Sequence, residues 1–303
     1  MAAVLRVATA DDAEEYTALR LAVTPHLVQT AAGLRHAWRH ASPASHLLVL
    51  VAEDGGRLVG AGRVAMNTWT SEEGAAAAMV CVHPEHRGRG VGGRIYAELA
   101  EHLRAHGARR VQGWAMGDDG TARWCERRGY RRTHQGRISR LDLTAALPPV
   151  PPVPAGVRVA SYAEVGPEAV YAVDLAAIAD EPGAVRQDTV PFGEWHDDVW
   201  ARPETDREAS TVVLVDGVPA AITTVEADRA TGRMWSGGTG TVRAQRGRGL
   251  AKLAKSVAVR RAAQRGVSTA FTNNDETNGP MLAINEWLGY RPFATTWTYL
   301  TSL

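Results

Sequence analysis

The feature that most constrains this chain is an arginine- and glycine-rich loop that occurs twice, each time between an expected strand and an expected helix. The second copy, residues 242–251, follows the β-rich run 234–242 and leads directly into a helical stretch at 250–265. Glycines let successive backbone N–H groups turn inward, and the helix adds its unpaired N-terminal N–H groups and the positive end of its dipole. Arg246 and Arg248 add full charges on long side chains, which suit a pyrophosphate. The loop therefore predicts an anion-binding site.

The first copy of the loop lies at residues 82–93 and precedes a helical stretch at 94–106. Arg-Gly-Arg-Gly recurs at residues 87 and 246, an offset of 159, and Gly-Tyr recurs at residues 129 and 289, an offset of 160. Because two landmarks recur at nearly one offset, we expect a duplicated domain. A solvated Arg/Gly turn is the alternative for a single copy, but two copies in the same strand–loop–helix context disfavour it.

Both loops have the pattern Arg-x-x-Gly-x-Gly/Ala, formed by Arg87, Gly90, Gly92 and by Arg246, Gly249, Ala251. This pattern resembles the acetyl-CoA pyrophosphate loop of the GNAT family of N-acetyltransferases. The resemblance continues through residues 272–290 in the second half and, more loosely, through residues 124–130 in the first half. Together these motifs cover about half of the chain, and tandem members of the family are known.

Two other nucleotide-binding patterns fit the loops less well. The segment 88–93 fits the Gly-x-Gly-x-x-Gly dinucleotide fingerprint, but a lone match is weak and the second copy has Lys252 in place of the third glycine. No Gly-Lys-Ser/Thr follows either loop, which disfavours an ATP-type P-loop.

The resemblance implies an α+β fold with two tandem acyl-CoA N-acyltransferase domains, each a mixed, mostly antiparallel sheet flanked by helices. We expect an N-terminal domain at residues 1–146, a proline-rich linker at 147–156 and a C-terminal domain at 157–303. The prolines of the linker favour an extended polyproline segment, which acts as a semi-rigid spacer. Strands at 137–143 and 295–300 are expected to close the first and second domains.

The resemblance also implies where acetyl-CoA binds. The strand before each loop and the strand after its helix are expected to diverge, so that the pantetheine arm enters the gap and backbone N–H groups hold the acetyl carbonyl. The expected acetyl-CoA-binding residues are Cys81, Val82, Arg87, Gly88, Arg89, Gly90, Val91, Gly92 and Gly93 in the first half, and Thr241, Val242, Arg246, Gly247, Arg248, Gly249, Leu250, Ala251 and Asn278 in the second. Helix capping is the alternative for Asn278, and it does not exclude contact with CoA.

The catalytic residues are harder to predict. The family often places a Glu four or six positions before the Val that opens the loop, but those positions here are Ala78 and Ala76, or Gly238 and Ser236. The nearest carboxylates in the second half are Glu226 and Asp228. We take Glu226 as the candidate base, acting directly or through water, with a solvated strand-end carboxylate as the alternative.

The family's usual proton donor is a Tyr, which is matched here by Cys125 and Asn285. Asn285 is taken as a catalytic candidate that orients the thioester, because its amide does not give up a proton. Cys125 is able to donate one, although packing is the commoner role of such a residue.

The acceptor is expected to be a small-molecule amine. Residues 180–208 hold nine carboxylates and three arginines, which would attract a cationic molecule such as a polyamine or an amino-sugar antibiotic. A solvated loop is the default interpretation of such a run. The matching stretch of the first half carries histidines and arginines instead, so the two halves are expected to bind different acceptors.

Composition excludes several other classes of protein. The net charge of +1 provides no global attraction to nucleic acid or membrane, and no apolar run is long enough to span a bilayer. Two cysteines suggest no disulfide framework, so a cytoplasmic location is expected. No close Cys/His cluster supports a metal site. A monomer or a homodimer is expected.

The sequence thus predicts an acetyl-CoA-dependent N-acetyltransferase whose chemistry lies in the C-terminal domain, because that half has the more complete series of motifs. The alternative is a CoA-binding pseudoenzyme or regulatory protein without turnover, which the missing Glu and Tyr motivate. Nucleic-acid binding through the Arg-Gly repeats is a third interpretation, and the net charge argues against it.

Overall fold

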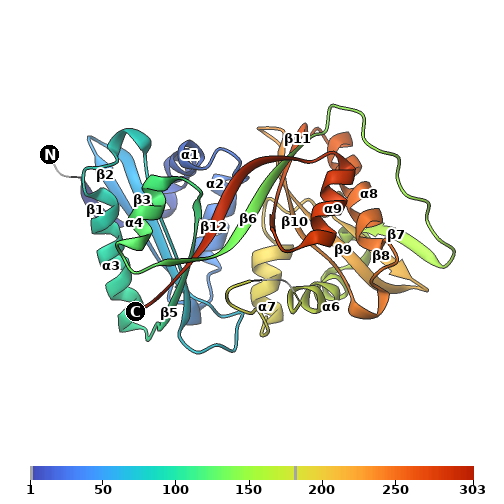
Figure 1. Ribbon diagram of the computed structural model, residues 1–303, viewed down its shortest axis with the longest axis horizontal. Helices are drawn as coiled ribbons and strands as arrows, with labels where there is room; N and C mark the ends of the chain where they lie inside the picture. Colours follow the sequence, from blue (N-terminus) through green and yellow to red (C-terminus); the bar gives the residue numbers. More distant parts are fainter. Residues whose placement is uncertain (1–2, 181–182) are drawn as a thin grey trace. The chain divides into compact units, whose positions relative to one another are not determined.

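The computed structural model describes residues 3–180 and 183–303, which form two compact units (Figure 1). Unit 1 comprises the chain up to His134 together with Thr296–Leu303, and unit 2 comprises Gln135–Thr295. Each unit is a mixed, mostly antiparallel sheet flanked by helices, so the predicted α+β fold class is confirmed.

The sheet of unit 1 has the strand order β1-β2-β3-β4-β5-β12. Its strands are β1 (Val4–Val7), β2 (Leu48–Asp54), β3 (Arg57–Met66), β4 (Ala75–Val82), β5 (Arg110–Met116) and most of β12 (Arg291–Ser302). Its helices are α1 (Ala13–Val23), α2 (Ala31–Arg39), α3 (Val91–Ala105) and α4 (Asp119–Glu126). Strands β4 and β5 pair in parallel at Ala75–Ala77 and Arg110–Gln112, and the pairing ends there.

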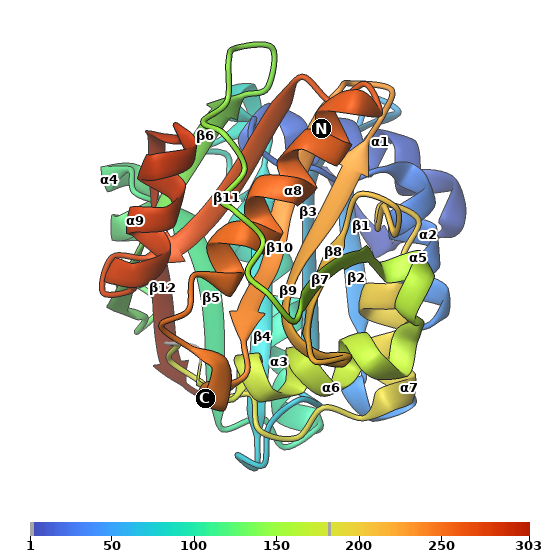
Figure 2. The same ribbon diagram turned by 90° about the vertical axis from the view of Figure 1, so that its right-hand side faces the viewer.

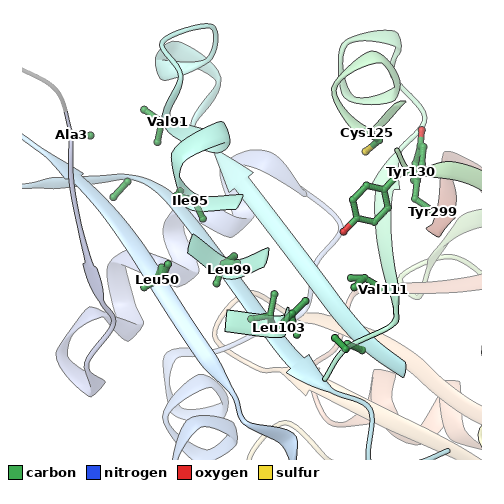
Figure 3. Packing of buried hydrophobic residues seen from close by; sticks show 14 of the residues in the cluster. Ala3, Leu50, Val91, Ile95, Leu99, Leu103, Val111, Cys125, Tyr130 and Tyr299 are labelled. Atoms are coloured by element: carbon green, nitrogen blue, oxygen red, sulfur yellow. The ribbon is translucent and has the colours of Figure 1, made fainter. Parts of the chain in front are cut away.

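The core of unit 1 lies between α3 and the sheet. Val91, Ile95, Leu99 and Leu103 recur every four residues, so they share one helical face, and all four are buried. Figure 3 shows them lined up along α3 in a cluster that also contains Tyr299, from the end of the chain. Packing of this face fixes α3, and therefore the loop that precedes it, against β4.

The sheet of unit 2 has the strand order β6-β11-β10-β9-β8-β7. Its strands are the later part of β6 (Arg131–Asp142), β7 (Val157–Ser161), β8 (Thr211–Val215), β9 (Val218–Asp228), β10 (Arg233–Thr241) and β11 (Thr269–Asp275). Its helices are α5 (Tyr162–Val165), α6 (Pro167–Ile178), α7 (Phe192–Trp195), α8 (Leu250–Gln264) and α9 (Gly279–Leu288). Strands β10 and β11 pair in parallel at Arg233–Trp235 and Thr269–Phe271.

Helices cover both faces of this second sheet. On one face α6 packs so closely on β10 that a Cβ at Gly240 would lie 2.1 Å from the Cβ of Ala177, and only glycine fits there. On the other face α8 crosses the strands (Figure 2), where Ala258 and Val259 pack with Val225 and Met234. The bulge and the carboxylates described below lie on the α6 face.

The closing strands differ from the sequence-based expectation. Gly136–Asp142 of β6 pair with β11 in unit 2, although they were expected to close the first domain. Thr296–Ser302 of β12 pair with β5 in unit 1, although they were expected to close the second domain. A strand's own pattern shows which face is buried but not its pairing partner, so this exchange was not foreseeable. The assignment of domains to residues 1–146 and 157–303 stays a prediction.

Candidate functional site

The two predicted anion loops have the same backbone conformation. In each loop a 3₁₀ turn, at Pro84–His86 or Arg243–Gln245, precedes two glycines with positive φ. The second glycine of each pair, Gly90 (φ 81°) or Gly249 (φ 75°), occupies the N-cap position of α3 or α8. A Cβ at either position would meet nothing within 4 Å. Glycine is therefore required by the backbone conformation and not by crowding, and space is left beside the helix N-termini.

An arginine secures each loop to the strand before it. Arg87 Nε donates to Val82 O at 3.2 Å, and Arg246 Nε donates to Thr241 O at 3.0 Å. The N–H of Val242 is already donated to Ala220 O at 2.9 Å. In a strand the N–H and C=O of one residue point to the same side, and that side alternates from one residue to the next. The N–H and C=O of Thr241 therefore point away from β9, towards the gap beside β11. The predicted residues of each loop are thus brought together within their own unit.

Asp180 forms ion pairs with two arginines of the second loop. Its carboxylate accepts from Arg246 Nη2 at 2.6 Å and from Arg243 Nη2 at 2.7 Å. The bond from Arg246 and then the bond from Arg243 hold the pKa of this carboxyl below its usual range. The site predicted to bind the CoA pyrophosphate is therefore paired with a carboxylate of the same unit.

Unit 1 has an open pocket where β4 and β5 diverge, with about 470 Å³ of open space including its mouth. Its wall is largely aromatic, formed by Tyr96, Trp114, Trp124, Tyr130 and Tyr299. Cys125 also lines it and lies beside Tyr130 in Figure 3. Burial raises the pKa of the Cys125 thiol to about 11, so the thiol is neutral at pH 7. The gap predicted for the pantetheine arm is present in this unit.

In unit 2 the strand before the loop carries a β-bulge. Ser236 pairs with Val225 and Thr239 pairs with Thr223, so β10 has one extra residue at Gly237–Gly238. A bulge leaves an unpaired residue and re-aims the local backbone. The corresponding strand of unit 1, β4, pairs with β3 without any shift of register.

Two carboxylates approach this bulge from the α6 face. A Cβ at Gly237 would lie 3.2 Å from Glu226 Oε1, and a Cβ at Gly238 would lie 3.3 Å from Asp174 Oδ1. Burial raises the pKa of Glu226, although the charge of Arg202, 3.6 Å away, opposes it. The predicted base Glu226 thus faces the bulge and is not a solvated strand-end residue.

Asp174 was missed by the sequence analysis. It is buried on α6, where Trp195 Nε1 donates to its Oδ2 at 2.8 Å, and burial raises its pKa. Nearby, the hydroxyl groups of Tyr162 and Thr224 form a hydrogen bond of 2.8 Å. The available signal was a lone acid on an otherwise apolar helix beyond the first turn, and it pointed to a buried polar role.

Asn285 lies on the opposite face of the sheet from Glu226, because α9 packs in the same cluster as α8. Its Nδ2 donates to Asn274 Oδ1 at 2.6 Å, whereas its own Oδ1 is buried without a hydrogen-bond partner among the described residues. Asn278 caps α9 by accepting from Met281 N at 3.3 Å, as the alternative interpretation proposed. The structure therefore places the two catalytic candidates on either side of the bulged strand and does not bring them into contact.

The acidic run at residues 180–208 is partly compensated by arginines. Asp206 accepts from Arg229 and from Arg265, each at 2.9 Å, and both arginines lie outside the run. Asp180 is paired as described above, and Glu181 lies outside the described residues. The charge that remains open to an acceptor is therefore smaller than the sequence count suggests.

Residues 3–180 and 183–303 contain neither an arranged cluster of metal ligands nor a membrane-spanning helix. No group of three or more His, Cys, Asp or Glu side chains there is arranged to hold a metal ion. Within the same ranges, no helix combines the length and apolar character needed to cross a membrane.

Comparison with known proteins agrees with the geometry of the loops. The model of the acetyltransferase (GNAT) family matches residues 12–130. The chain is 30% identical over 262 residues to mycothiol acetyltransferase of Streptomyces coelicolor, covering 84% of this chain and 79% of that protein.

Two solved structures share the fold. A tandem GNAT protein from the clavulanic acid biosynthesis pathway has a TM-score of 0.78 and 24% identity, covering 99% of this chain and 98% of its own. A GCN5-related N-acetyltransferase from Sphaerobacter thermophilus has a TM-score of 0.72 and 20% identity, covering 99% of this chain and 95% of its own. Together with the sequence relatives, these findings show that the chain belongs to the acetyltransferase (GNAT) family.

Proposed function

We propose that this N-acetyltransferase uses acetyl-CoA to acetylate a primary amine of a small molecule, and that unit 2 carries the transfer. The observation that carries this proposal is the bulge at Gly237–Gly238, which two carboxylates approach from one face. Acyl transfer needs a group that holds the acetyl carbonyl and, next to it, a group that accepts a proton. At the bulge, backbone groups that are not paired with β9 lie beside two carboxylates.

Both loops fit a CoA pyrophosphate. Each provides two positive-φ glycines, a free helix N-terminus and arginines, with no atom where a Cβ of the second glycine would project. The residues proposed to hold the cofactor in unit 2 are Thr241, Val242, the loop Arg246–Ala251 and Asn278. In unit 1 they are Cys81, Val82 and the loop Arg87–Gly93.

The residues of unit 2 divide the chemistry between the two faces of the sheet. A lysine-like amine with a pKa of ~10.4 must lose a proton first, which costs about 4.6 kcal/mol at pH 7. Glu226 takes that proton, and its raised pKa makes it a better acceptor than an exposed carboxylate. Asp174 holds the incoming ammonium, since one of its oxygens is fixed by Trp195 and the other faces Gly238. Asn285 orients the thioester from the α9 side.

The acceptor is proposed to be a small, cationic amine. Two acidic groups beside the bulge favour a positively charged molecule over an anionic one. The relatives named mycothiol acetyltransferase support a small-molecule acceptor, and the acceptor of those enzymes belongs first in any panel of amines.

The test is calorimetric titration with acetyl-CoA of the parent, Gly90→Glu and Gly249→Glu, followed by turnover with the amine panel. The two substitutions are matched, because each adds a negative charge at a positive-φ N-cap glycine with open space around it. Two sites in the parent, with one lost in each variant, establish two working loops. Turnover that disappears in Gly90→Glu and persists in Gly249→Glu contradicts the placement in unit 2.

A second candidate function is a CoA-binding protein without turnover. It is favoured by the absence of a carboxylate on either strand before a loop, and by Cys125 and Asn285 at the position where the family usually has Tyr. If the protein releases free CoA from acetyl-CoA only when an amine is added, this candidate is excluded. Retained binding without release for every amine would support it.

A further inference from the structure

Lys255 is a buried lysine that has no role in the reaction proposed above. The chain has only two lysines, Lys252 and Lys255, and both lie on α8. Lys255 is 1% exposed, and its Nζ lies 5.2 Å from the centre of the Tyr290 ring. Burial alone lowers its pKa to about 7. Among the described side chains, no carboxylate is paired with it.

The duplication identifies the part of unit 2 in which Lys255 lies. It is the sixth residue of α8, and the sixth residue of α3 is Tyr96. Tyr290 follows Gly289 and precedes β12, just as Tyr130 follows Gly129 and precedes β6. Tyr96 and Tyr130 have ring centres 6.0 Å apart and line the pocket where β4 and β5 diverge. By this correspondence, Lys255 and Tyr290 belong to the region of unit 2 where the parallel pairing of β10 and β11 ends.

Other polar groups at this point of unit 2 have few partners. Asn285 Oδ1 is buried without a hydrogen bond among the described residues, and the buried Tyr290 hydroxyl has no partner there apart from the Ser236 side chain. Tyr290 lies near Ser236, the last paired residue of β10 before the bulge, and Thr272 Oγ1 donates to Ser236 O at 3.1 Å. Unpaired buried polar groups are costly, so a lysine, a hydroxyl and an amide oxygen together indicate a ligand with polar and anionic atoms.

We propose that Lys255 protonates the CoA sulfur as it leaves in unit 2, a role that rests on the proposed function. The amine nitrogen bonds to the acetyl carbon, and the carbon–sulfur bond breaks with its electron pair on sulfur. The Lys255 ammonium gives its proton to that sulfur. Glu226 takes the proton of the ammonium and, after attack, the second amine proton, and passes each to water. Neutral Lys255 takes one proton back from water, so each cycle releases one proton to solvent and returns Glu226 and Lys255 to their starting states.

The choice of lysine at this site supports the same role. Two of the 34 Lys and Arg residues are lysines, so arginine is the usual cation of this chain. A buried lysine amine can exchange a proton near neutral pH, whereas a guanidinium stays charged. A cation that served only to bind an anion would have no need to titrate.

The scarcity of lysine makes a direct measurement possible. Protein labelled with ¹³C at lysine Cε gives two side-chain signals, and Lys255→Met and Lys252→Met assign them by removing one each. We expect the Lys255 signal to titrate near pH 7 in the free protein. Bound CoA should move that midpoint upwards, because a thiolate stabilises the ammonium, whereas desulfo-CoA should not. An equal midpoint with CoA and desulfo-CoA overturns the proposal.

Kinetics provides the second measurement. Lys255→Met should lower kcat by about 10²-fold, the lower end for loss of a proton-transfer group, with little change in KM for acetyl-CoA. Lys255→Arg should not rescue kcat, since a guanidinium keeps its proton. Lys252→Met, three residues away over the Trp287 ring, is the matched control and should retain kcat.

The two proposals fail in distinguishable ways. A parent protein that neither binds CoA nor transfers acetyl overturns both. A parent that binds CoA and turns over, with unchanged kcat in Lys255→Met, overturns only the role of Lys255. Thermal unfolding of each variant checks the fold, and we expect Lys255→Met to be at least as stable as the parent because it removes a buried amine.

Discussion

Units 1 and 2 have the same anion loop but differ in the strand that precedes it. Their loops are the same in backbone conformation, in positive-φ glycines and in the arginine that bonds to the preceding strand. The strands before those loops differ, since β4 pairs regularly whereas β10 has a bulge at Gly237–Gly238. Phosphate binding depends on backbone geometry, which tolerates wide changes of side chain, whereas group transfer depends on a few side chains.

The side chains facing those strands differ in charge. In unit 1 the buried Tyr16 lies near Cys81, and the charges of Arg20 and Arg63 act on its hydroxyl. In unit 2 the corresponding face has Asp174 and Glu226. The duplicated frame thus places two arginine charges near this face in one unit and two carboxylates in the other, which supports different ligands on a shared cofactor-binding scaffold.

The largest expected effect comes from changing the shared loop in one unit at a time. Gly249→Glu should reduce turnover to background, while Gly90→Glu should lose a CoA site and keep turnover. The cost of placing Glu at positive φ, roughly 1–2 kcal/mol, is common to both variants and so cancels in the comparison. Steady-state assays of both proteins provide the measurement, and equal losses would mean that the units are not functionally distinct.

The next effect concerns the acidic face of unit 2. Glu226→Gln keeps the shape of the side chain and should lower kcat by about 10²- to 10⁴-fold. Only the deprotonated carboxylate accepts a proton, and burial raises its pKa. The parent's kcat should therefore fall as pH drops through that raised pKa, and the variant should lack this acidic limb. A variant with full kcat and an unchanged pH profile would remove Glu226 from the mechanism.

Two tyrosines nine residues apart should separate the stabilities of the units. Tyr299 is buried in unit 1 and Tyr290 in unit 2. Replacement of either by Ala should cost on the order of 3 kcal/mol in the free energy of unfolding of its own unit. Hydrogen exchange should show faster exchange in β5 for Tyr299→Ala and in β10 for Tyr290→Ala. If both variants showed faster hydrogen exchange in the same strands, the placement of the two closing strands in opposite units would be refuted.

The smallest effect concerns Asp180, which has no described counterpart on the first loop. Asp180→Asn removes a carboxylate that competes for Arg246 and Arg243, so acetyl-CoA should bind unit 2 slightly more tightly. The gain should shrink as salt is added, because exposed charges are screened. Calorimetry with Gly90→Glu as the background isolates the site of unit 2, and weaker binding would show that Asp180 supports the loop instead of competing with it.

The local parts of this fold could be predicted from the sequence. Glycine at an N-cap with positive φ, Asp216-Gly217 between two apolar runs, and a Pro-rich segment each have a local physical cause. The two anion loops followed from the first of these causes. For Glu226 the sequence left two interpretations open, a base that faces the cleft and a solvated strand-end carboxylate, because the strand pattern alone does not show what covers that face of the sheet.

The rest depended on contacts between distant residues. The bulge in β10 arises from pairing with β9, and nothing in the local pattern of residues 233–241 reveals the extra residue. Asp174 and Lys255 look like ordinary helical residues until tertiary packing buries them. The exchange of β6 and β12 between units is a choice of partner, which the residues of a single strand do not encode.

That exchange has a consequence for synthesis on the ribosome. Unit 1 is almost entirely translated by His134, yet its sheet needs Thr296–Ser302 beside β5, and these residues are made only after all of unit 2. Until Thr296–Ser302 are translated, β5 has an unpaired edge, which exposes backbone groups able to pair with other chains. We expect nascent chains of intermediate length to require protection at that edge, and a gene fragment encoding the first half alone to yield aggregated protein.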